Sequence, residues 1–308
     1  MIKAVSVHKK RNKFRLSVSR KIFLVVNGLA LIGFAVLCLL PFINLFSVSL
    51  SSKNAVNAGL VSFFPVDITL NAYQYLLKQS AFFAAFWMSI KRVFIGTAIS
   101  MVVIIFAAYP LSLSSEELPG KRFYIVICVI SMFFSGGLIP TYIVITNLGL
   151  YNTIWALVLP SAMNCWNMVL MLNFIRRVPK ELSEYAQIEG AGYFTLLLKI
   201  ILPVSLPAIA TVLLFTVVGH WNAWFDGYIY MSSENWPLQT YIYNILDSLK
   251  QLQASLNKTE EDLALLSKLD DKTLRSAQIF IAMLPIMMIY PFAQKYFVQG
   301  LMLGSVKE

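Results

Sequence analysis

The chain has 308 residues, of which 58% are hydrophobic and 13% charged, and its mean hydropathy is +0.70. Soluble domains are about 45–50% apolar and about 25% charged, so this composition excludes an ordinary soluble globular enzyme. A formal net charge of +10 would favour nucleic acid as the partner of a soluble chain. In a membrane protein the same excess of Lys and Arg carries topology information instead. We therefore predict an all-α polytopic membrane protein with no nucleic-acid partner.

Few residues in this sequence could support catalysis or bind a metal. The three cysteines, Cys38, Cys128 and Cys165, lie in apolar runs without a CxxC pair, which is typical of small buried side chains. The chain has only two histidines, His8 and His220, so it offers almost nothing from which to build a zinc site or a Ser/His/Asp triad. The sequence also has no phosphate-binding glycine loop. We expect no catalytic residue, metal or cofactor on this chain, so any use of ATP must come from a partner.

Six apolar segments approach the length of about 20 residues that a helix needs to cross the hydrocarbon core of a membrane. They are residues 22–46, 86–112, 123–145, 153–175, 200–226 and 277–300. The first apolar run is too long for a signal-peptide core and has no small-residue cleavage site after it. We therefore expect a basic tail over 1–21 and a six-helix domain over 22–308.

Lys and Arg gather on one side of this predicted topology. They are dense in the tail, and further basic residues follow the second span, at Lys121 and Arg122, and the fourth, at Arg176, Arg177 and Lys180. The two connections on the other side are longer and poorer in basic residues. By the positive-inside bias, both termini are predicted to be cytoplasmic.

Two long loops are predicted on the outer side. In the loop 47–80, the sequence NAYQYLLKQS indicates a short amphipathic helix outside the membrane. The loop 227–275 contains LNKTEEDLALLSKLDDK, a charged run with Leu at helical spacing. This run fits a solvated surface helix or a docking surface for an external partner, and both interpretations stay open.

The connection between the fourth and fifth spans, over 176–200, has a distinctive pattern. After Pro179, two acidic residues, Glu181 and Glu184, stand near the first turn of a short predicted helix, where the helix dipole favours negative charge. Three small residues in a row, at 190–192, end or bend that helix. Pro203 and Pro207 then fall inside the predicted fifth span. The pattern predicts a short interfacial helix followed by an interrupted span.

These residues resemble the EAA loop of permease subunits in binding-protein-dependent ABC importers, whose pattern is E-A-A-x-x-D-G-A followed by I-x-L-P. The matching residues are Glu184, Ala186, Glu189, Gly190, Ala191, Ile200, Leu202 and Pro203. Tyr185 stands where the family usually has Ala, and Glu189 where it usually has Asp. Both changes keep the helical or acidic character of the position.

Other segments are similar to maltose-type carbohydrate permeases, and especially to the branch that imports oligosaccharides released from polysaccharides. They are FAAYPLS at 106–112, GGLIPTYIV at 136–144, GHWNAWFDG at 219–227, WPLQTYI at 236–242 and PFAQKYFVQGLMLGSVKE at 291–308. The charged stretch after Asp247 is longer than in the shorter family members, which leaves the structure of the outer loop open.

The resemblance implies a type I importer in a bacterial cytoplasmic membrane. Its partners would be a second homologous permease, an ABC ATPase dimer that holds ATP and Mg, membrane lipid, and an extracellular solute-binding lipoprotein. The EAA helix would couple ATPase closure to the switch between inward and outward states. The implied coupling residues are Glu184, Ala186, Glu189, Gly190, Ala191, Gly192 and Pro203. Glu184 is expected to pair with a basic group on the ATPase, and the alternative is a solvated carboxylate at a helix start.

Aromatic and polar side chains in the spans are candidates for a sugar path. They are Asn164, Trp166 and Asn167 in the fourth span, and Trp221, Asn222, Trp224 and Asp226 in the fifth. Packing between helices or anchoring at the membrane interface would explain the same residues. Lys91 and Arg92 interrupt the second span, and they would either snorkel to the headgroups or attract an acidic oligosaccharide.

Three alternatives remain open from the sequence. A membrane-bound transferase would need facing carboxylates or a metal cluster near one surface, and the acidic candidates, Asp226 and the EAA glutamates, lie on opposite sides. A secondary carrier would be expected to show paired broken helices in an internal repeat, which the sequence does not show. The same ABC machinery could carry a solute other than a sugar, because amino-acid, phosphate and metal permeases share the EAA loop.

Overall fold

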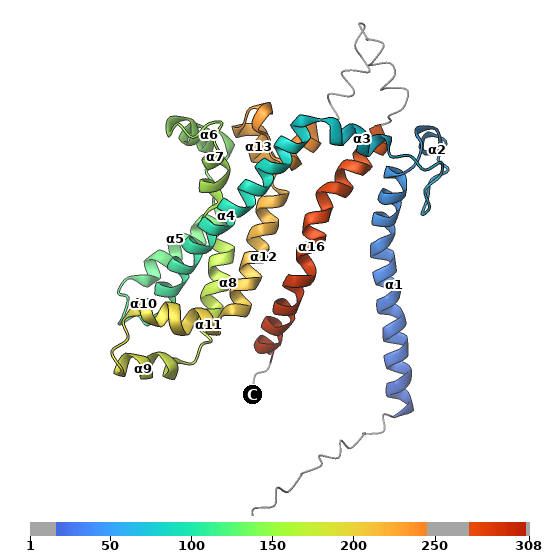
Figure 1. The fold of residues 1–308 in the computed structure, drawn as a ribbon. Helices are drawn as coiled ribbons and strands as arrows, with labels where there is room; N and C mark the ends of the chain where they lie inside the picture. Colours follow the sequence, from blue (N-terminus) through green and yellow to red (C-terminus); the bar gives the residue numbers. More distant parts are fainter. Residues whose placement is uncertain (1–16, 245–270, 306–308) are drawn as a thin grey trace, which may run out of the picture.

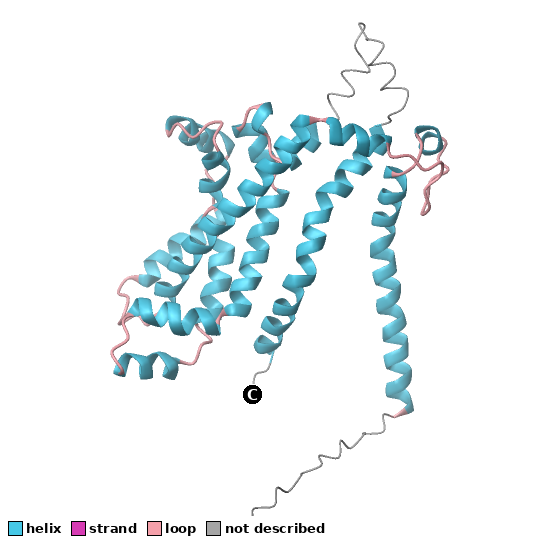
Figure 2. Ribbon diagram, viewed as in Figure 1, coloured by secondary structure: helices cyan, strands magenta, loops and turns pink. Residues whose placement is uncertain are grey.

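The computed structural model describes residues 17–244 and 271–305, and this part of the chain consists of helices and short loops without a strand (Figures 1 and 2). The elements, in chain order, are α1 (Val18–Ser49), α2 (Lys53–Asn57), α3 (Asn71–Lys78), α4 (Ser80–Ser112), α5 (Lys121–Phe133), α6 (Leu138–Asn147), α7 (Ile154–Val158), the 3-10 turn η1 (Leu159–Ser161), α8 (Cys165–Ile175), α9 (Lys180–Ile188), α10 (Tyr193–Leu196), the π-helical turn η2 (Leu197–Ile201), α11 (Leu202–Val204), α12 (Leu206–Asn222), α13 (Phe225–Tyr230), the 3-10 turn η3 (Ser233–Asn235) and α16 (Asp271–Ser305).

Three of these helices, α1, α4 and α16, are long and apolar enough to cross a membrane on their own. Three more spans arise if each of three bent helix pairs counts as one. The pairs are α5 with α6, bent by 115°, α7–η1 with α8, bent by 47°, and Tyr193–Val204 with α12, bent by 83°. The all-α fold and the six apolar segments predicted from the sequence are therefore confirmed, but only three of the segments form continuous helices.

The predicted third span, residues 123–145, is wrong as a single helix because the chain turns sharply after Phe133. Gly137 has φ +84 and ψ 177, a backbone conformation that is essentially restricted to glycine. This conformation ends α5 and starts α6 in a new direction. The pair of glycines in the sequence was the local signal for the break.

The predicted fifth span, residues 200–226, is wrong at its start because α12 begins at Leu206. Pro207 has no N–H to donate to the carbonyl of Pro203, so the helical ladder is interrupted between them. Ser205 leaves the helical conformation with φ −91 and ψ 10, and the segment Tyr193–Val204 runs at 83° to α12. The structure thus has an elbow at Ser205 where the sequence indicated an interrupted but continuous span.

The core forms around α4, which packs against α8 and α12, while α12 also packs against α16 (Figure 1). At the centre of this packing, Ile104 on α4, Met168 and Met171 on α8 and Val212 on α12 are fully buried. Because these side chains come from three helices far apart in sequence, they fix α8 and α12 relative to α4 and so position the segments that leave their ends.

Helix α1 lies at the edge of the bundle and packs against α16, with the rings of Phe46 and Phe280 4.8 Å apart between centroids. The most apolar stretch of α1 has no buried residue, as expected for a helix in contact with lipid. One end of α1 is fastened to the loop beyond it, where Ser47 Oγ donates to the carbonyl of Phe63 at 2.7 Å and Ser49 Oγ lies 2.8 Å from the hydroxyl of Tyr73. Tyr73 belongs to α3, the amphipathic helix that the sequence predicted.

Candidate functional site

Helix α9 projects from the end of the bundle where α8 and α12 meet, and it lies beyond α10 and α11 (Figure 1). It has no buried residue, and its two most exposed large apolar side chains, Tyr185 and Ile188, are 71% and 82% exposed. A helix of nine residues is marginal in water on its own, and an exposed apolar face adds no stability unless something covers it. The predicted interfacial helix is therefore present, and its apolar face has no cover within the described part of the chain.

The glycine after α9 closes the helix through a specific backbone arrangement. Gly190 has φ +85, its N–H donates to the carbonyl of Gln187 at 2.9 Å, and the Ala191 N–H donates to the carbonyl of Ala186 at 2.9 Å. This pair of bonds is the Schellman ending, which needs a left-handed residue and so favours glycine. Gly192 differs, because its φ is −75 and the space around its Cα is open. Only the first of these two glycines is required by the backbone.

The carboxylates of Glu184 and Glu189 both face solvent. Glu184 makes no hydrogen bond or ion pair with any residue that the structure describes. It lines a cavity of about 590 Å³ between α9 and the loop 113–120, together with Lys121 and Lys180. The structure therefore leaves Glu184 available to a group from outside the chain.

On the side of this cavity opposite α9, the loop 113–120 is held by a capping box between Ser114 and Glu117, which was not predicted from the sequence. The Ser114 N–H donates to Glu117 Oε2 at 2.8 Å, and the Glu117 N–H donates to Ser114 Oγ at 3.2 Å. The backbone and hydroxyl of Ser114, followed by the charges of Lys180 and Lys121, lower the pKa of Glu117 below its ordinary value. The S-x-x-E pattern of a capping box was the signal in the sequence.

On the opposite end of the bundle, Arg92 of α4 is buried, at 1% exposure, against the start of α13. Its Nη1 donates to Asp226 Oδ1 at 3.0 Å and to the carbonyl of Ala223 at 3.2 Å, and its Nη2 donates to Asp226 Oδ2. Snorkelling of Arg92 to the headgroups is therefore wrong, because the guanidinium points into the protein. Its charge is neutralised by Asp226, so it is not a free cation for an acidic solute either.

The other candidate path residues separate into different contacts. Trp221 is buried and donates from Nε1 to the carbonyl of Ala282 at 3.0 Å, while Asn167 Nδ2 donates to Thr216 Oγ1 at 3.3 Å and joins α8 to α12. Asn164 caps α8 by accepting from the Asn167 N–H at 3.0 Å. Asn167 and Trp221 therefore join helices to one another, and Asn164 fixes the start of α8.

Six candidates keep at least part of their surface accessible, namely Lys91, Asn164, Trp166, Asn222, Trp224 and Asp226. Trp224 stacks on Tyr243, with ring centroids 4.1 Å apart, and its carbonyl accepts from Thr240 Oγ1 at 2.6 Å. Tyr243 and Thr240 were missed by the sequence analysis, because nothing local in the sequence indicates that they meet Trp224. The structure thus does not gather the predicted path residues into one cluster.

The described residues contain no group of three or more His, Cys, Asp or Glu side chains that could hold a metal ion. What the structure shows instead is an apolar helix bundle, a broken helix at Ser205, and the exposed helix α9 with the unpaired carboxylate of Glu184. These features suit a protein that binds a partner and changes conformation. A fold and site of this kind define a membrane permease that presents a helix to a separate partner.

The family model described as "Binding-protein-dependent transport system inner membrane component" matches residues 80–303. The chain belongs to this family, and it is a non-catalytic permease subunit of an ABC importer.

Individual relatives support the same assignment over nearly the whole chain. The chain is 35% identical to the polygalacturonan/rhamnogalacturonan transport system permease protein YtcP of Bacillus subtilis, over 90% of this chain and 95% of that protein. It is 35% identical to the protein LplC of the same organism, over 93% and 95%. Among solved structures, it matches a chain of a bacterial ABC transporter involved in the import of the acidic polysaccharide alginate, with 32% identity, a TM-score of 0.78 and coverage of 92% and 99%.

Proposed function

We propose that this chain is one of two permeases that form the path of an ATP-driven importer for acidic oligosaccharides. Its partners are a second homologous permease, an ABC ATPase dimer that holds ATP and Mg, and an extracellular solute-binding protein. The complex lies in the bacterial cytoplasmic membrane, with both termini of this chain on the cytoplasmic side. The excess of Lys and Arg on the tail and on the α4–α5 and α8–α9 connections supports this orientation.

The exposed helix α9 is the observation that carries the coupling role. It lies where the EAA loop resemblance expects it, it has no buried residue, and its apolar face is open. Covering Tyr185 and Ile188 with a partner would stabilise the contact by roughly 25 cal/mol per Å² of apolar surface removed from water. Glu184 beside them would add a charge-assisted hydrogen bond to a basic group. ATPase closure would then move α9 and, through α10 and α11, the elbow at Ser205.

An acidic cargo is supported by the substrates that the names of two similar proteins give, polygalacturonan/rhamnogalacturonan and the acidic polysaccharide alginate. On this chain, Lys91 is the candidate that fits. It is exposed on α4, and it makes no hydrogen bond or ion pair with any described residue, whereas the charge of Arg92 beside it is neutralised by Asp226. An unpaired cation near the outer end of a span would raise the local concentration of anionic oligosaccharides.

Purification of the tagged chain from its native membrane in mild detergent tests the coupling role. The wild-type chain should bring a second permease and an ATPase dimer with it in a fixed ratio. Glu184→Lys should lose the ATPase and keep the second permease, because the new ammonium would repel the basic group expected opposite it. Glu234→Lys is the matched control, with the same charge change on an exposed residue of η3 at the opposite end of the bundle, and it should keep both partners. Equal ATPase recovery with both variants would contradict the proposal.

Competition during uptake tests the cargo. Oligogalacturonides should inhibit uptake of a labelled acidic oligosaccharide, and neutral oligosaccharides of the same length should not. Lys91→Gln should weaken the preference for acidic over neutral chains, since it removes the cation and keeps a flexible polar side chain. If neutral and acidic oligosaccharides enter equally well in the wild type, the acidic cargo is wrong while the coupling role is untouched.

A further inference from the structure

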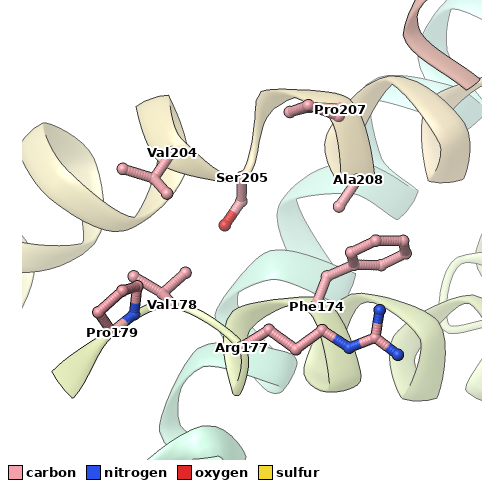
Figure 3. Close-up of a pocket in the computed structure, with 8 residues that line it drawn as sticks. All are labelled: Phe174, Arg177, Val178, Pro179, Val204, Ser205, Pro207 and Ala208. Atoms are coloured by element: carbon pink, nitrogen blue, oxygen red, sulfur yellow. The ribbon is translucent and has the colours of Figure 1, made fainter. Parts of the chain in front are cut away.

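A second, smaller pocket lies at the elbow between α11 and α12, and none of the roles above uses it. Its volume is about 260 Å³. Its lining comes from the end of α8, the loop that leads into α9, and the elbow itself: Phe174, Arg177, Val178, Pro179, Val204, Ser205, Pro207 and Ala208 (Figure 3). The walls are mostly apolar, and one cation and one hydroxyl are the polar side chains on them.

The hydroxyl belongs to Ser205, which is 5% exposed and whose Oγ has no hydrogen-bond partner. Figure 3 shows this oxygen directed into the pocket, between Val178 and Val204. Leaving a buried hydroxyl unpaired costs roughly 1–3 kcal/mol. A ligand with a polar atom at this depth would remove that cost.

The cation belongs to Arg177, whose guanidinium makes no hydrogen bond or ion pair with any residue in the described part of the chain. Its guanidinium carbon lies 5.6 Å from the centroid of the Phe174 ring, and this contact orients the group at the edge of the pocket. Arg176, by comparison, donates from Nη2 to the carbonyl of Leu111 at 3.3 Å. The donors of Arg177 are thus free for an anion, and a guanidinium suits a phosphate well.

The backbone strengthens this preference for an anion. Ser205 is the N-cap of α12, a helix of 17 residues, and its side chain makes no capping bond. In the first turn of α12, Leu206 and Ala208 keep an N–H and Pro207 does not, and the helix dipole favours a negative group at that end. No acidic side chain lines the pocket to compete for Arg177.

The surroundings of the pocket favour a lipid over a free anion as its occupant. Val204 in the lining and Leu206 next to it are large apolar residues that remain exposed, and lipid hydrocarbon would cover them in a membrane-spanning chain. A free phosphate would gain nothing from walls of Val, Pro and Phe. A glycerophospholipid would place its phosphate at Arg177, an ester or headgroup hydroxyl at Ser205, and the start of an acyl chain along the rim.

We propose that this elbow pocket binds the headgroup of an anionic glycerophospholipid. Bound there, the lipid would brace Pro179, where the chain enters α9, against the elbow that leads to α12. The site requires a chain that spans the membrane, which the family shows, and it does not depend on the cargo or on Glu184.

The test uses the full importer complex in nanodiscs of phosphatidylcholine with and without phosphatidylglycerol. Native mass spectrometry counts the retained phosphatidylglycerol, and hydrogen exchange reports protection of residues 204–209. Arg177→Gln should lower retention about fivefold, as expected for one basic group near an anionic surface. Ser205→Ala should lower it less, and Arg177→Lys should retain most of it. Arg122→Gln, which removes an Arg at the start of α5 on the same side, should leave it unchanged.

Each other outcome overturns the proposal in a recognisable way. Equal retention by wild type and Arg177→Gln would mean that the pocket is not a lipid site. Equal protection of 204–209 by inorganic phosphate in phosphatidylcholine discs would make it a site for free anions. If the isolated chain retained the lipid and the assembled complex did not, a partner subunit, and not a lipid, would cover the pocket in the importer. Normal complex assembly by Arg177→Gln, an exposed position, is the check that the variant folds.

Discussion

At the scale of single residues, the buried pair Arg92 and Asp226 predicts an unequal response to removal of either partner. Asp226→Asn leaves a guanidinium uncompensated at 1% exposure, whereas Arg92→Met leaves a carboxylate that is already 28% exposed and can take up water. Removing one partner of a buried pair costs about 3–5 kcal/mol, and the full value is expected only for Asp226→Asn. Thermal unfolding of the purified complexes measures the difference. Equal destabilisation by the two variants would show that the burial of Arg92 does not determine the cost.

Two glycines after α9 give a second prediction at this scale. Gly190→Ala places a side chain at φ +85, which costs about 1–2 kcal/mol and weakens the end of α9. Gly192→Ala has an ordinary φ of −75 and open space, so it should be neutral. ATPase recovery with the tagged permease should therefore fall for Gly190→Ala and stay normal for Gly192→Ala. If ATPase recovery fell for Gly192→Ala and stayed normal for Gly190→Ala, the Schellman ending at Gly190 would not be what holds α9 in place.

At the scale of elements, the contact between α4 and α12 depends on a close approach. A Cβ on Gly96 would lie 2.6 Å from the ring atoms Cε1 and Nε2 of His220. Gly96→Ala should therefore push the two helices apart or displace the ring, at a cost of about 1–3 kcal/mol. Gly219→Ala, on α12 with nothing within 4 Å, should instead stabilise the helix slightly. Denaturation of the two variants side by side measures this, and a neutral Gly96→Ala would mean that the helices are not held at this distance.

The capping box at Ser114 and Glu117 predicts a pH dependence in the loop 113–120. The pKa of Glu117 is lower in the folded state than in the unfolded chain, because the bonded form is the carboxylate. Its contribution is therefore complete above the ordinary pKa of a glutamate and is lost as the pH falls through the lower, folded value. Hydrogen-exchange protection factors of the loop, which correct for the pH dependence of the intrinsic exchange rate, should fall on acidification in the wild type. Glu117→Gln should flatten this response, and an unchanged response would assign it to another group.

The sequence was informative about elements where the signal is local. The position of α9, the helix α3 and the apolar spans follow from periodicity, prolines, glycines and length, and all are present. The sharp turn after Phe133 and the elbow at Ser205 were misjudged, because a run of apolar residues has the same composition whether it crosses the membrane straight or turns. The direction of a broken helix depends on what packs beside it, here α8 and α4.

At the scale of the whole molecule, the features that were missed are long-range. Arg92 and Asp226 are 134 residues apart, and Trp224 meets Tyr243 through a loop that has no local pattern for the contact. The role of Arg92 was therefore misjudged, although both residues had been singled out. The outer-loop docking prediction concerns residues that lie largely within 245–270, outside the described residues. The predicted basic tail over 1–21 is also outside them as far as residue 16, and its last residues, from Val18 on, belong to α1. Both stay predictions.

The central claim is that α9 transmits ATPase movement to the path through the membrane. Reconstitution of the importer in proteoliposomes, with acidic oligosaccharide and binding protein supplied on the outer face of the permease, allows uptake and ATP hydrolysis to be measured together. For Glu184→Lys we predict loss of uptake and of substrate-stimulated hydrolysis, with both permeases still present and folded, while Glu234→Lys keeps the wild-type uptake per ATP hydrolysed. Wild-type uptake per ATP hydrolysed in Glu184→Lys would contradict the account.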